Sequence, residues 1–276
     1  MLKTHFLSRE EKAFTKKVWS YYKASGRHDL PWRKTADSYK ILVSELMLQQ
    51  TQVVRVLPKY TEFLKQFPSV RRLAVAPLGD VLKAWQGLGY NRRAKFLWLT
   101  AQVVVNGYKG KFPTMFEDLK KLPGIGHYTA GAIMNFAFGE PIPLIETNVR
   151  TVYLHHFFHD KNYVSDNELT PIIERTLDRS NPREWNWALM DYGAHLKGTI
   201  GNINSKSTTY KKQSTFKGSD REIRGAILRT LVAGPQTNVT LSKKLKNIEK
   251  ERLELQLKAL LNEGLIVKDK KKYQFP

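Results

Sequence analysis

The sequence contains no cysteine, and this absence excludes several kinds of site at once. A disulfide framework, a Cys-ligated zinc or iron-sulfur site and a thiol nucleophile all require that residue. Acidic residues are also scarce: 25 Asp and Glu stand against 46 Lys and Arg in 276 residues, a formal net charge of +21. The like charges of so basic a chain repel one another in the compact state. Binding to a polyanion would offset this repulsion, and nucleic acid is the leading candidate partner.

Long hydrophobic runs are missing as well. No apolar stretch approaches the roughly 18 to 20 residues of a membrane-spanning helix, and the chain does not open on a secretory signal. The competing partner for a basic protein, an anionic membrane, is therefore not expected. We expect an intracellular protein of the cytoplasm or nucleoid of a prokaryote, acting as a monomer.

Strand-like alternation is almost absent, whereas apolar residues recur at helical spacing between Pro, Gly and Asn breaks. The first 198 residues therefore predict an all-α domain of many short helices. The expected helices are 9–24, 38–50, 53–66, 69–75, 78–86, 91–107, 114–121, 126–138, 145–158, 165–178 and 183–195.

A change of composition marks the end of this domain. Residues 199–219 are rich in Gly, Asn, Ser, Thr and Lys, which is typical of a linker or of a loop lying on a polyanion. Residues 220–276 then predict a second, basic unit with three helices and a hairpin. The helices are 220–232, 239–247 and 249–263, and the hairpin strands are 264–267 and 273–275. This order predicts a winged-helix-like unit.

Glu45 is a candidate for acid catalysis. In the stretch Ser44–Val53 it stands among apolar residues that a polar cluster follows, and on a helix it shares a face with Leu48 and Gln49. A carboxyl beside an apolar wall tends to keep its proton near neutral pH, as a general acid must. The alternative is an amphipathic helix with one solvated Glu.

Leu122–Ala130 places Gly124 and Gly126 in a tight turn just before a helix. Glycine leaves backbone N–H groups unshielded, so a DNA phosphate can sit at the helix N-terminus. The spacing matches the hairpin of a helix-hairpin-helix element, and the alternative is an ordinary turn between helices.

Trp85–Ala94 combines a Gly-flanked turn with two arginines. Leu88 or Tyr90 could enter a base stack while Arg92 or Arg93 contacts phosphate. The alternative is a core tyrosine with solvated arginines.

Trp32 and Arg33 could line a pocket for a planar base, or merely pack and cap. Glu146 begins a helix, where a carboxylate commonly compensates the helix dipole. Paired with Glu45 it suits another role: one carboxyl protonates a leaving group and the other stabilises a sugar cation. The histidines at 155, 156 and 159 lack the pattern of acidic or cysteine partners that a metal site needs, so we interpret them as surface or packing residues and expect no metal site.

Five blocks together resemble one known family. They are Leu30–Arg33, Ser44–Val53, Trp85–Ala94, Leu122–Ala132 and Asn148–Arg150. They resemble the adenine DNA glycosylases of the MutY group, within the helix-hairpin-helix glycosylase superfamily, over about residues 8 to 198. The resemblance implies two helical subdomains with a base-flipping pocket between them, followed here by the winged-helix-like unit.

The resemblance also implies roles for individual residues. Glu45 would protonate the flipped purine at N7 and later activate water, and Asn148 would support the catalytic carboxylate. Tyr128 stands where bifunctional relatives carry a Schiff-base lysine, which implies a monofunctional enzyme. Trp32, Arg33 and Leu48 would line the base pocket. Gln50 and Tyr90 would enter the emptied duplex.

Three departures from the family pattern are visible. Glu146 occupies the position of a usual Asp, and the extra methylene moves the charge by on the order of an ångström. The four cysteines of the family's iron-sulfur cluster are missing after Met190–Ala194, so no cluster is expected; a monovalent cation at the hairpin turn is the one cofactor considered. The usual C-terminal domain that recognises 8-oxoguanine is replaced by residues 220–276.

The leading hypothesis is a monofunctional glycosylase that excises adenine mispaired with 8-oxoguanine or G in double-stranded DNA. Two alternatives remain open. The same fold could act on thymine or uracil in G mismatches or on a damaged purine, although N7 protonation by Glu45 favours a purine. The chain could instead be a lesion-binding protein without catalytic activity.

Overall fold

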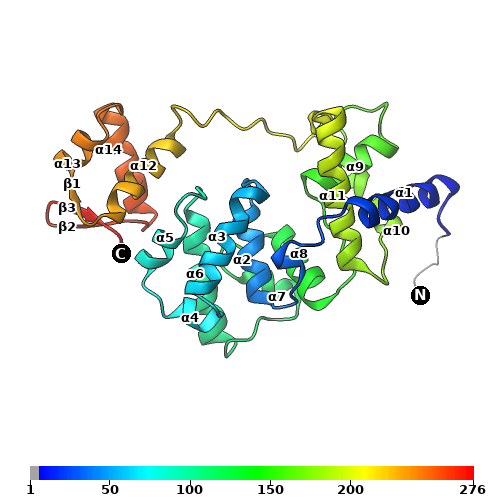
Figure 1. Ribbon diagram of the computed structural model, residues 1–276, viewed down its shortest axis with the longest axis horizontal. Helices are drawn as coiled ribbons and strands as arrows, with labels where there is room; N and C mark the ends of the chain where they lie inside the picture. The colour runs from blue at the N-terminus through cyan, green and yellow to red at the C-terminus, as the bar shows by residue number, and fades with distance from the viewer. Residues whose placement is uncertain (1–5) are drawn as a thin grey trace. The chain divides into compact units, whose positions relative to one another are not determined.

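The computed structural model describes residues 6–276, which are largely helical (Figure 1). The chain folds into two compact units, each built from two separate stretches. Unit 1 combines the N-terminal part up to Ile41 with Ile125–Lys212, and unit 2 combines Leu42–Gly124 with Gln213–Pro276. The polypeptide therefore leaves the first unit within one helix, α2 (Ser38–Leu48), and returns to it at a glycine-rich turn.

Unit 1 is built around the contact between α9 and α11, which lie side by side in Figure 1. Its helices are α1 (Arg9–Ser25), η1 (Pro31–Arg33), α8 (His127–Phe138), α9 (Thr147–Phe157), α10 (Asp166–Thr176), α11 (Pro182–Ile200) and η2 (Ile203–Lys206). Aromatic rings fill the space between α1, α9 and α11. Phe14 lies 5.1 Å from Tyr153 and 6.2 Å from Trp185, and all three side chains are buried.

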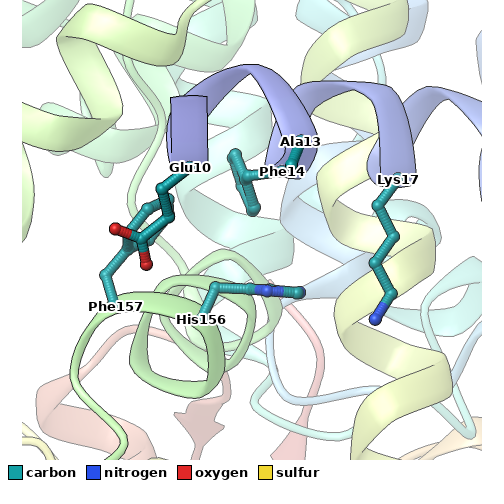
Figure 2. A pocket seen from close by; sticks show the side chains of 6 residues that line it. All are labelled: Glu10, Ala13, Phe14, Lys17, His156 and Phe157. Atoms are coloured by element: carbon teal, nitrogen blue, oxygen red, sulfur yellow. The ribbon is translucent and has the colours of Figure 1, made fainter. Parts of the chain in front are cut away.

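A shallow pocket opens beside this aromatic core, between α1 and α9 (Figure 2). Phe14 and Phe157 form its apolar part, and Glu10 and Lys17 stand at its rim. Burial, with the nearby charges of His155 and Lys17, lowers the pKa of His156 to about 4. The ring is therefore neutral at physiological pH, and it packs edge-on against Phe14. None of the candidate site residues lines this pocket.

Unit 2 contains a helical part and a C-terminal module. The helical part comprises α3 (Val53–Gln66), α4 (Val70–Ala74), α5 (Leu78–Ala84), α6 (Arg92–Gly107) and α7 (Phe116–Lys121), with the last turns of α2. Its core is again apolar and aromatic. Phe63 packs edge-on against Trp85, both are fully buried, and the indole N–H of Trp98 donates to the carbonyl of Ala76.

The C-terminal module follows the order helix, strand, helix, helix, strand, strand. Its elements are α12 (Asp220–Val232), β1 (Gln236–Thr237), α13 (Asn238–Lys244), α14 (Lys250–Asn262), β2 (Val267–Asp269) and β3 (Lys272–Gln274). The sheet is antiparallel, with β3 in the middle, and Lys268 faces Tyr273 across the wing. The predicted all-α fold and its winged-helix-like ending are confirmed.

Several predicted element ends differ from the structure: α2 ends at Leu48 rather than at 50, and α13 at Lys244 rather than at 247. Two other differences have a clear physical reason. The helix expected at 183–195 continues to Ile200, because Leu196 is buried and the Thr199 hydroxyl donates back to the carbonyl of His195. The strand expected at 264–267 begins only at Val267. Leu265 and Ile266 are apolar because they fill the module's core, not because they alternate in a strand.

Within residues 6–276, no helix is long and apolar enough to cross a membrane, and no group of three or more His, Cys, Asp or Glu side chains could hold a metal ion.

Candidate active site and DNA-contacting residues

Glu45 lies in the buried part of a helix. Residues 41–47 of α2 are all buried, and Glu45 is only 9 % exposed. Apolar side chains precede and follow it at helical spacing, with Leu42 and Leu48 three residues away on either side. The structure therefore places this carboxyl in the partly dry setting that the sequence predicted, with Leu48 half-buried nearby along the helix.

Arg93 fixes the end of the same helix. The last carbonyls of a helix have no hydrogen-bond partner within it. Here one guanidinium nitrogen of Arg93 donates to them. Its Nη1 donates to the carbonyls of Leu46 at 2.6 Å and Met47 at 3.0 Å, and also to that of Gln49. The C-terminal turn of the helix that carries Glu45 is thus held by α6.

The same side chain also holds the turn that precedes α6. Nη2 of Arg93 donates to the carbonyls of Leu88 at 3.1 Å and Gly89 at 2.9 Å. Burial lowers the pKa of Arg93 to about 10, although nearby Tyr90 opposes the shift. The guanidinium is still charged at neutral pH, and it is 7 % exposed. The prediction that Arg93 binds a DNA phosphate is therefore wrong: its donors serve backbone carbonyls.

The other predicted phosphate ligand of this turn is differently placed. Arg92 is exposed, and its guanidinium lies 5.5 Å from the centroid of the Phe96 ring. Because its side chain is exposed, Arg92 is accessible to a phosphate, whereas the buried Arg93 is not.

Two of the three residues predicted to enter the duplex, Gln50 and Tyr90, share an unusual backbone conformation, and we call these two the wedge residues. Gln50 has φ of 53° and Tyr90 has φ of 45°, in the left-handed region that residues other than glycine rarely adopt. Gln50 is exposed and Tyr90 half-buried. Leu88, in contrast, is 4 % exposed. The structure corrects the prediction for Leu88, since a buried core side chain is not presented to a duplex.

Glu146 is the N-cap of α9 in unit 1. One oxygen of its carboxylate accepts the backbone N–H groups of Asn148 at 2.8 Å and Val149 at 2.9 Å, and the other accepts the Asn148 side chain at 3.3 Å. Burial raises the pKa of Glu146, and the hydrogen bonds and the charge of Arg150 work against that rise. Asn148 thus binds the carboxylate of Glu146. Its support of the catalytic carboxylate, which the resemblance implies, stays a prediction.

The turn that carries this cap is packed directly on α11. A methyl group added at Gly193 would meet the carbonyl oxygen of Asn148 at 2.1 Å. Real Cβ atoms do not approach backbone so closely, and only glycine allows this crossing. Gly193 therefore sets the position of Asn148, and with it the first turn of α9.

A cluster of charges lies on the other side of α11. Arg33 donates through Nη1 and Nη2 to the two oxygens of Asp191 at 2.7 and 2.8 Å. Arg27 adds its backbone N–H and its Nε at 2.8 and 2.7 Å. Burial would raise the pKa of Asp191, but the two arginines outweigh it and hold that pKa below its usual range.

The ion pair with Asp191 occupies both terminal nitrogens of Arg33 and leaves its Nε–H without a hydrogen bond within residues 6–276. Its Nε is buried and has no hydrogen-bond partner among the described residues, while its guanidinium lies 5.4 Å from the Trp187 ring. Trp32, its neighbour in η1, is 6 % exposed. An unpaired buried donor is costly unless a ligand satisfies it.

The glycine turn before α8 keeps its backbone open. Gly124 has φ of 73°, and a Cβ there would meet that of Phe96 at 2.5 Å, so glycine is required. Gly126 is exposed, caps α8 and has open space around its missing side chain. The carbonyl of Pro123 already accepts the Thr100 hydroxyl at 2.7 Å. Tyr128 follows in the first turn of α8 and is half-buried.

Protein hydrogen bonds secure the segment after α11, where the family carries cysteines. Asn204 is buried and donates to the Thr151 hydroxyl on α9 at 2.6 Å. Backbone bonds join Val164 to Lys206 at 2.8 Å and to Thr208 at 3.0 Å.

Sequence reasoning missed several residues that build the site. The cap provided by Arg93, the close approach at Gly193 and the Asp191 cluster involve partners far apart in the chain, which no local pattern reveals. One signal was available: a buried-helix pattern that contains Gly193 and Asp191 marks positions with a special packing or pairing role.

The chain is similar to known proteins in sequence and in fold. The model of the HhH-GPD superfamily of base excision DNA repair proteins matches residues 43–177. The adenine DNA glycosylase of Buchnera aphidicola subsp. Schizaphis graminum is 34 % identical over 214 residues, which are 74 % of this chain and 61 % of that protein. The chain thus spans less than two thirds of that relative.

Two further relatives are matched over a larger share of their own length. The adenine DNA glycosylase of Mycobacterium tuberculosis H37Rv is 34 % identical over 235 residues, 78 % of this chain and 77 % of that protein. Among solved structures, a thermostable thymine-DNA glycosylase is 28 % identical with a TM-score of 0.62, covering 67 % of this chain and 87 % of its own. The chain belongs to the HhH-GPD superfamily of base excision DNA repair proteins, in the group of the adenine DNA glycosylases.

Proposed function

We propose that this protein is a monofunctional DNA glycosylase that excises adenine mispaired with 8-oxoguanine or G. The observation that carries the proposal is Glu45, a carboxyl held in a buried helix of the chain's matched region, whose end is fixed by Arg93. A glycosidic bond is cleaved by protonating the leaving group, and a buried carboxyl is suited to keep and deliver that proton.

The proposed reaction begins with proton transfer from Glu45 to N7 of the extruded adenine. The bond between C1′ and N9 then breaks, and its electron pair leaves with the base. The sugar is left as an oxocarbenium cation, which the carboxylate of Glu146 stabilises. Water adds at C1′ and gives its proton to the Glu45 carboxylate, so that an abasic site forms and the acid is restored.

Other residues could bind the extruded base or the DNA backbone. The buried, unpaired Nε–H of Arg33 can donate to the edge of a base, beside the buried indole of Trp32. Tyr128 has no amine, so no Schiff base forms and the strand is not nicked. Exposed Gly126 and Arg92 offer a backbone N–H and a cation to the DNA backbone. No cofactor is needed for any step; a monovalent cation at the turn stays a separate prediction.

The carboxylate of Glu146 is held by hydrogen bonds and is not free to move. Because its carboxylate caps α9, its charge is fixed in place by two backbone N–H groups. Preorganised charge is effective against a developing cation, although the same hydrogen bonds weaken it. We therefore expect Glu146→Asp to change the rate of excision rather than to abolish it.

The test is a panel of duplexes, each with one target pair. The targets are adenine opposite 8-oxoguanine or G, thymine or uracil opposite G, and hypoxanthine. Abasic sites are revealed with hot alkali, and Glu45→Gln is the control. The proposal expects strand scission only at adenine, only after alkali and only with the wild-type protein.

Excision of thymine opposite G is the second candidate. It is favoured by the likeness to the thymine-DNA glycosylase, which is 28 % identical. Cleavage at thymine and not at adenine would establish it. Tight binding without release of any base would instead support a lesion-binding protein.

A further inference from the structure

The two predicted wedge residues are held together by a residue from the linker. The side-chain amide of Gln213 donates to the side-chain oxygen of Gln50 at 3.1 Å and to the hydroxyl of Tyr90 at 2.5 Å. An amide NH₂ has two protons, so one Gln can serve both acceptors at once. All three residues belong to unit 2, although Gln213 is far from the others in sequence.

An arginine of the C-terminal module completes this contact. Nη1 of Arg221, in the first turn of α12, donates to the Tyr90 hydroxyl at 2.8 Å, and its guanidinium lies 5.6 Å from the ring centroid. Its Nη2 donates to the carbonyl of Ser214 at 2.7 Å. Arg221 therefore closes the linker onto α12 and holds Tyr90 through the same group.

Both wedge residues need such support. A non-glycine residue at positive φ is strained and persists only where its surroundings hold it. Arg93 binds the backbone of the Tyr90 turn, but it does not reach the hydroxyl. Gln213 and Arg221 are the groups that hold the exposed ends of Gln50 and Tyr90.

We propose that Gln213 and Arg221 form a latch that positions Tyr90 and Gln50 for entry into a duplex, and so help this chain to discriminate a mispaired target from a paired one. The inference rests on the proposed function, because the duplex is its ligand. It gives the linker and the first turn of α12 a part in reading DNA. They are positioning residues: they act through Tyr90 and Gln50, not on the reacting base.

Charge supports the assignment to DNA. When Tyr90 enters a base stack, its hydroxyl leaves the Arg221 guanidinium. That guanidinium then has two donors available, and a phosphate accepts them with better geometry than a phenol does. Withdrawing the tyrosine from its latch is therefore offset by a new contact with the DNA backbone.

The first experiment tests the latch without DNA. Endoproteinase Lys-C cleaves after lysine, and Lys217 lies in the exposed linker between the two latch residues. Tyr90→Phe removes the hydroxyl that both residues bind, and it should raise the rate of cleavage at Lys217 several-fold. Arg221→Ala should do the same. An unchanged rate in both variants would show that the linker is not held, and would overturn the proposal.

The second experiment measures entry into DNA. A duplex carries 2-aminopurine beside a target adenine opposite 8-oxoguanine, and a second duplex carries it beside a normal pair. Wild-type protein should increase the fluorescence of the first far more than that of the second. We expect Arg221→Ala and Gln213→Ala to reduce this ratio about tenfold, and Arg221→Lys to recover part of it.

The matched control is Arg229→Ala. Arg229 is an exposed arginine of the same helix, and its removal takes away the same charge. Equal effects of Arg229→Ala and Arg221→Ala would show that only net charge acts, and the latch would be refuted. If wild-type protein excises no base from any duplex, the proposed function fails, while the proteolysis and fluorescence still decide the latch.

Discussion

Replacing Gly193 by alanine should displace the first turn of α9 and impair excision without touching a reacting group. The added methyl would lie 2.1 Å from the carbonyl oxygen and 2.6 Å from the carbonyl carbon of Asn148. Ordinary contact needs about 3.4 Å, so the two helices must separate by on the order of 1 Å. These are backbone atoms, and no side chain can rotate away to make room.

Two effects of opposite sign determine the change in stability. Overpacking a buried helix crossing costs about 1–3 kcal/mol, and somewhat more where only backbone can move. Alanine in place of a helical glycine gains back up to about 1 kcal/mol. We expect Gly193→Ala to lose about 1–3 kcal/mol of the free energy of unfolding. A shift of 1 Å in Glu146 and Asn148 should lower the excision rate by about a hundredfold.

Gly198→Ala is the control that isolates the close approach. It lies in the same helix, and an added methyl there meets nothing within 4 Å. It should leave excision unchanged and stabilise the helix by up to about 1 kcal/mol. Urea unfolding followed by tryptophan fluorescence gives the stabilities, and single-turnover assays give the rates. A Gly193→Ala variant with wild-type stability and rate would refute the reasoning.

Three further predictions concern the groups that hold the site. Arg93→Ala leaves the buried carbonyls of Leu46 and Met47 without a donor and should cost about 3 kcal/mol or more, measured by urea unfolding; a loss below 1 kcal/mol would mean that water replaces the guanidinium. Asp191 has a lowered pKa, so the unfolded chain takes up its proton first. Its stabilising effect is present above about pH 4 and is lost as the pH falls through the lower folded pKa. Asp191→Asn should therefore make the acid-induced fall in stability shallower, and an unchanged slope would contradict this. Asn204→Ala should cost about 1–2 kcal/mol and speed Lys-C cleavage at Lys206, and equal cleavage of both proteins would show that the Thr151 contact does not hold the segment.

The sequence predicted the helices of this protein well and their ends less well. Periodicity located α3 at its observed bounds: Phe67-Pro68 marks its end, and Pro58, although inside the segment, does not interrupt the helix. It failed at the end of α11, where Lys197, Gly198 and Thr199 look like a linker. Those residues stay helical because the helix is anchored by Leu196, and burial of that kind is a tertiary property.

For the candidate site, too, the sequence indicated the chemical groups but not the tertiary contacts. The residues that we propose to act through their own chemistry, Glu45 and Glu146, stood out as isolated carboxyls in apolar or helix-starting contexts. The apolar setting of Glu45 was predicted from its neighbours, whereas the hydrogen-bond partners of Glu146 and Arg93 were not. Arg93 was predicted to bind a phosphate because the sequence alone does not show whether an arginine is exposed or buried. Gln213 lay in a polar linker, and nothing in its neighbourhood indicated two partners more than a hundred residues away.

The central claim is that Glu45 supplies the proton that releases adenine. The most direct measurement is the single-turnover release of free adenine from a duplex containing adenine opposite 8-oxoguanine, followed by chromatography for wild type and Glu45→Gln. The glutamine keeps the size of the side chain and removes its acid. We expect the wild type to release adenine, and Glu45→Gln to be slower by at least about a thousandfold while binding the duplex with similar affinity. Release at the wild-type rate by Glu45→Gln would contradict the account.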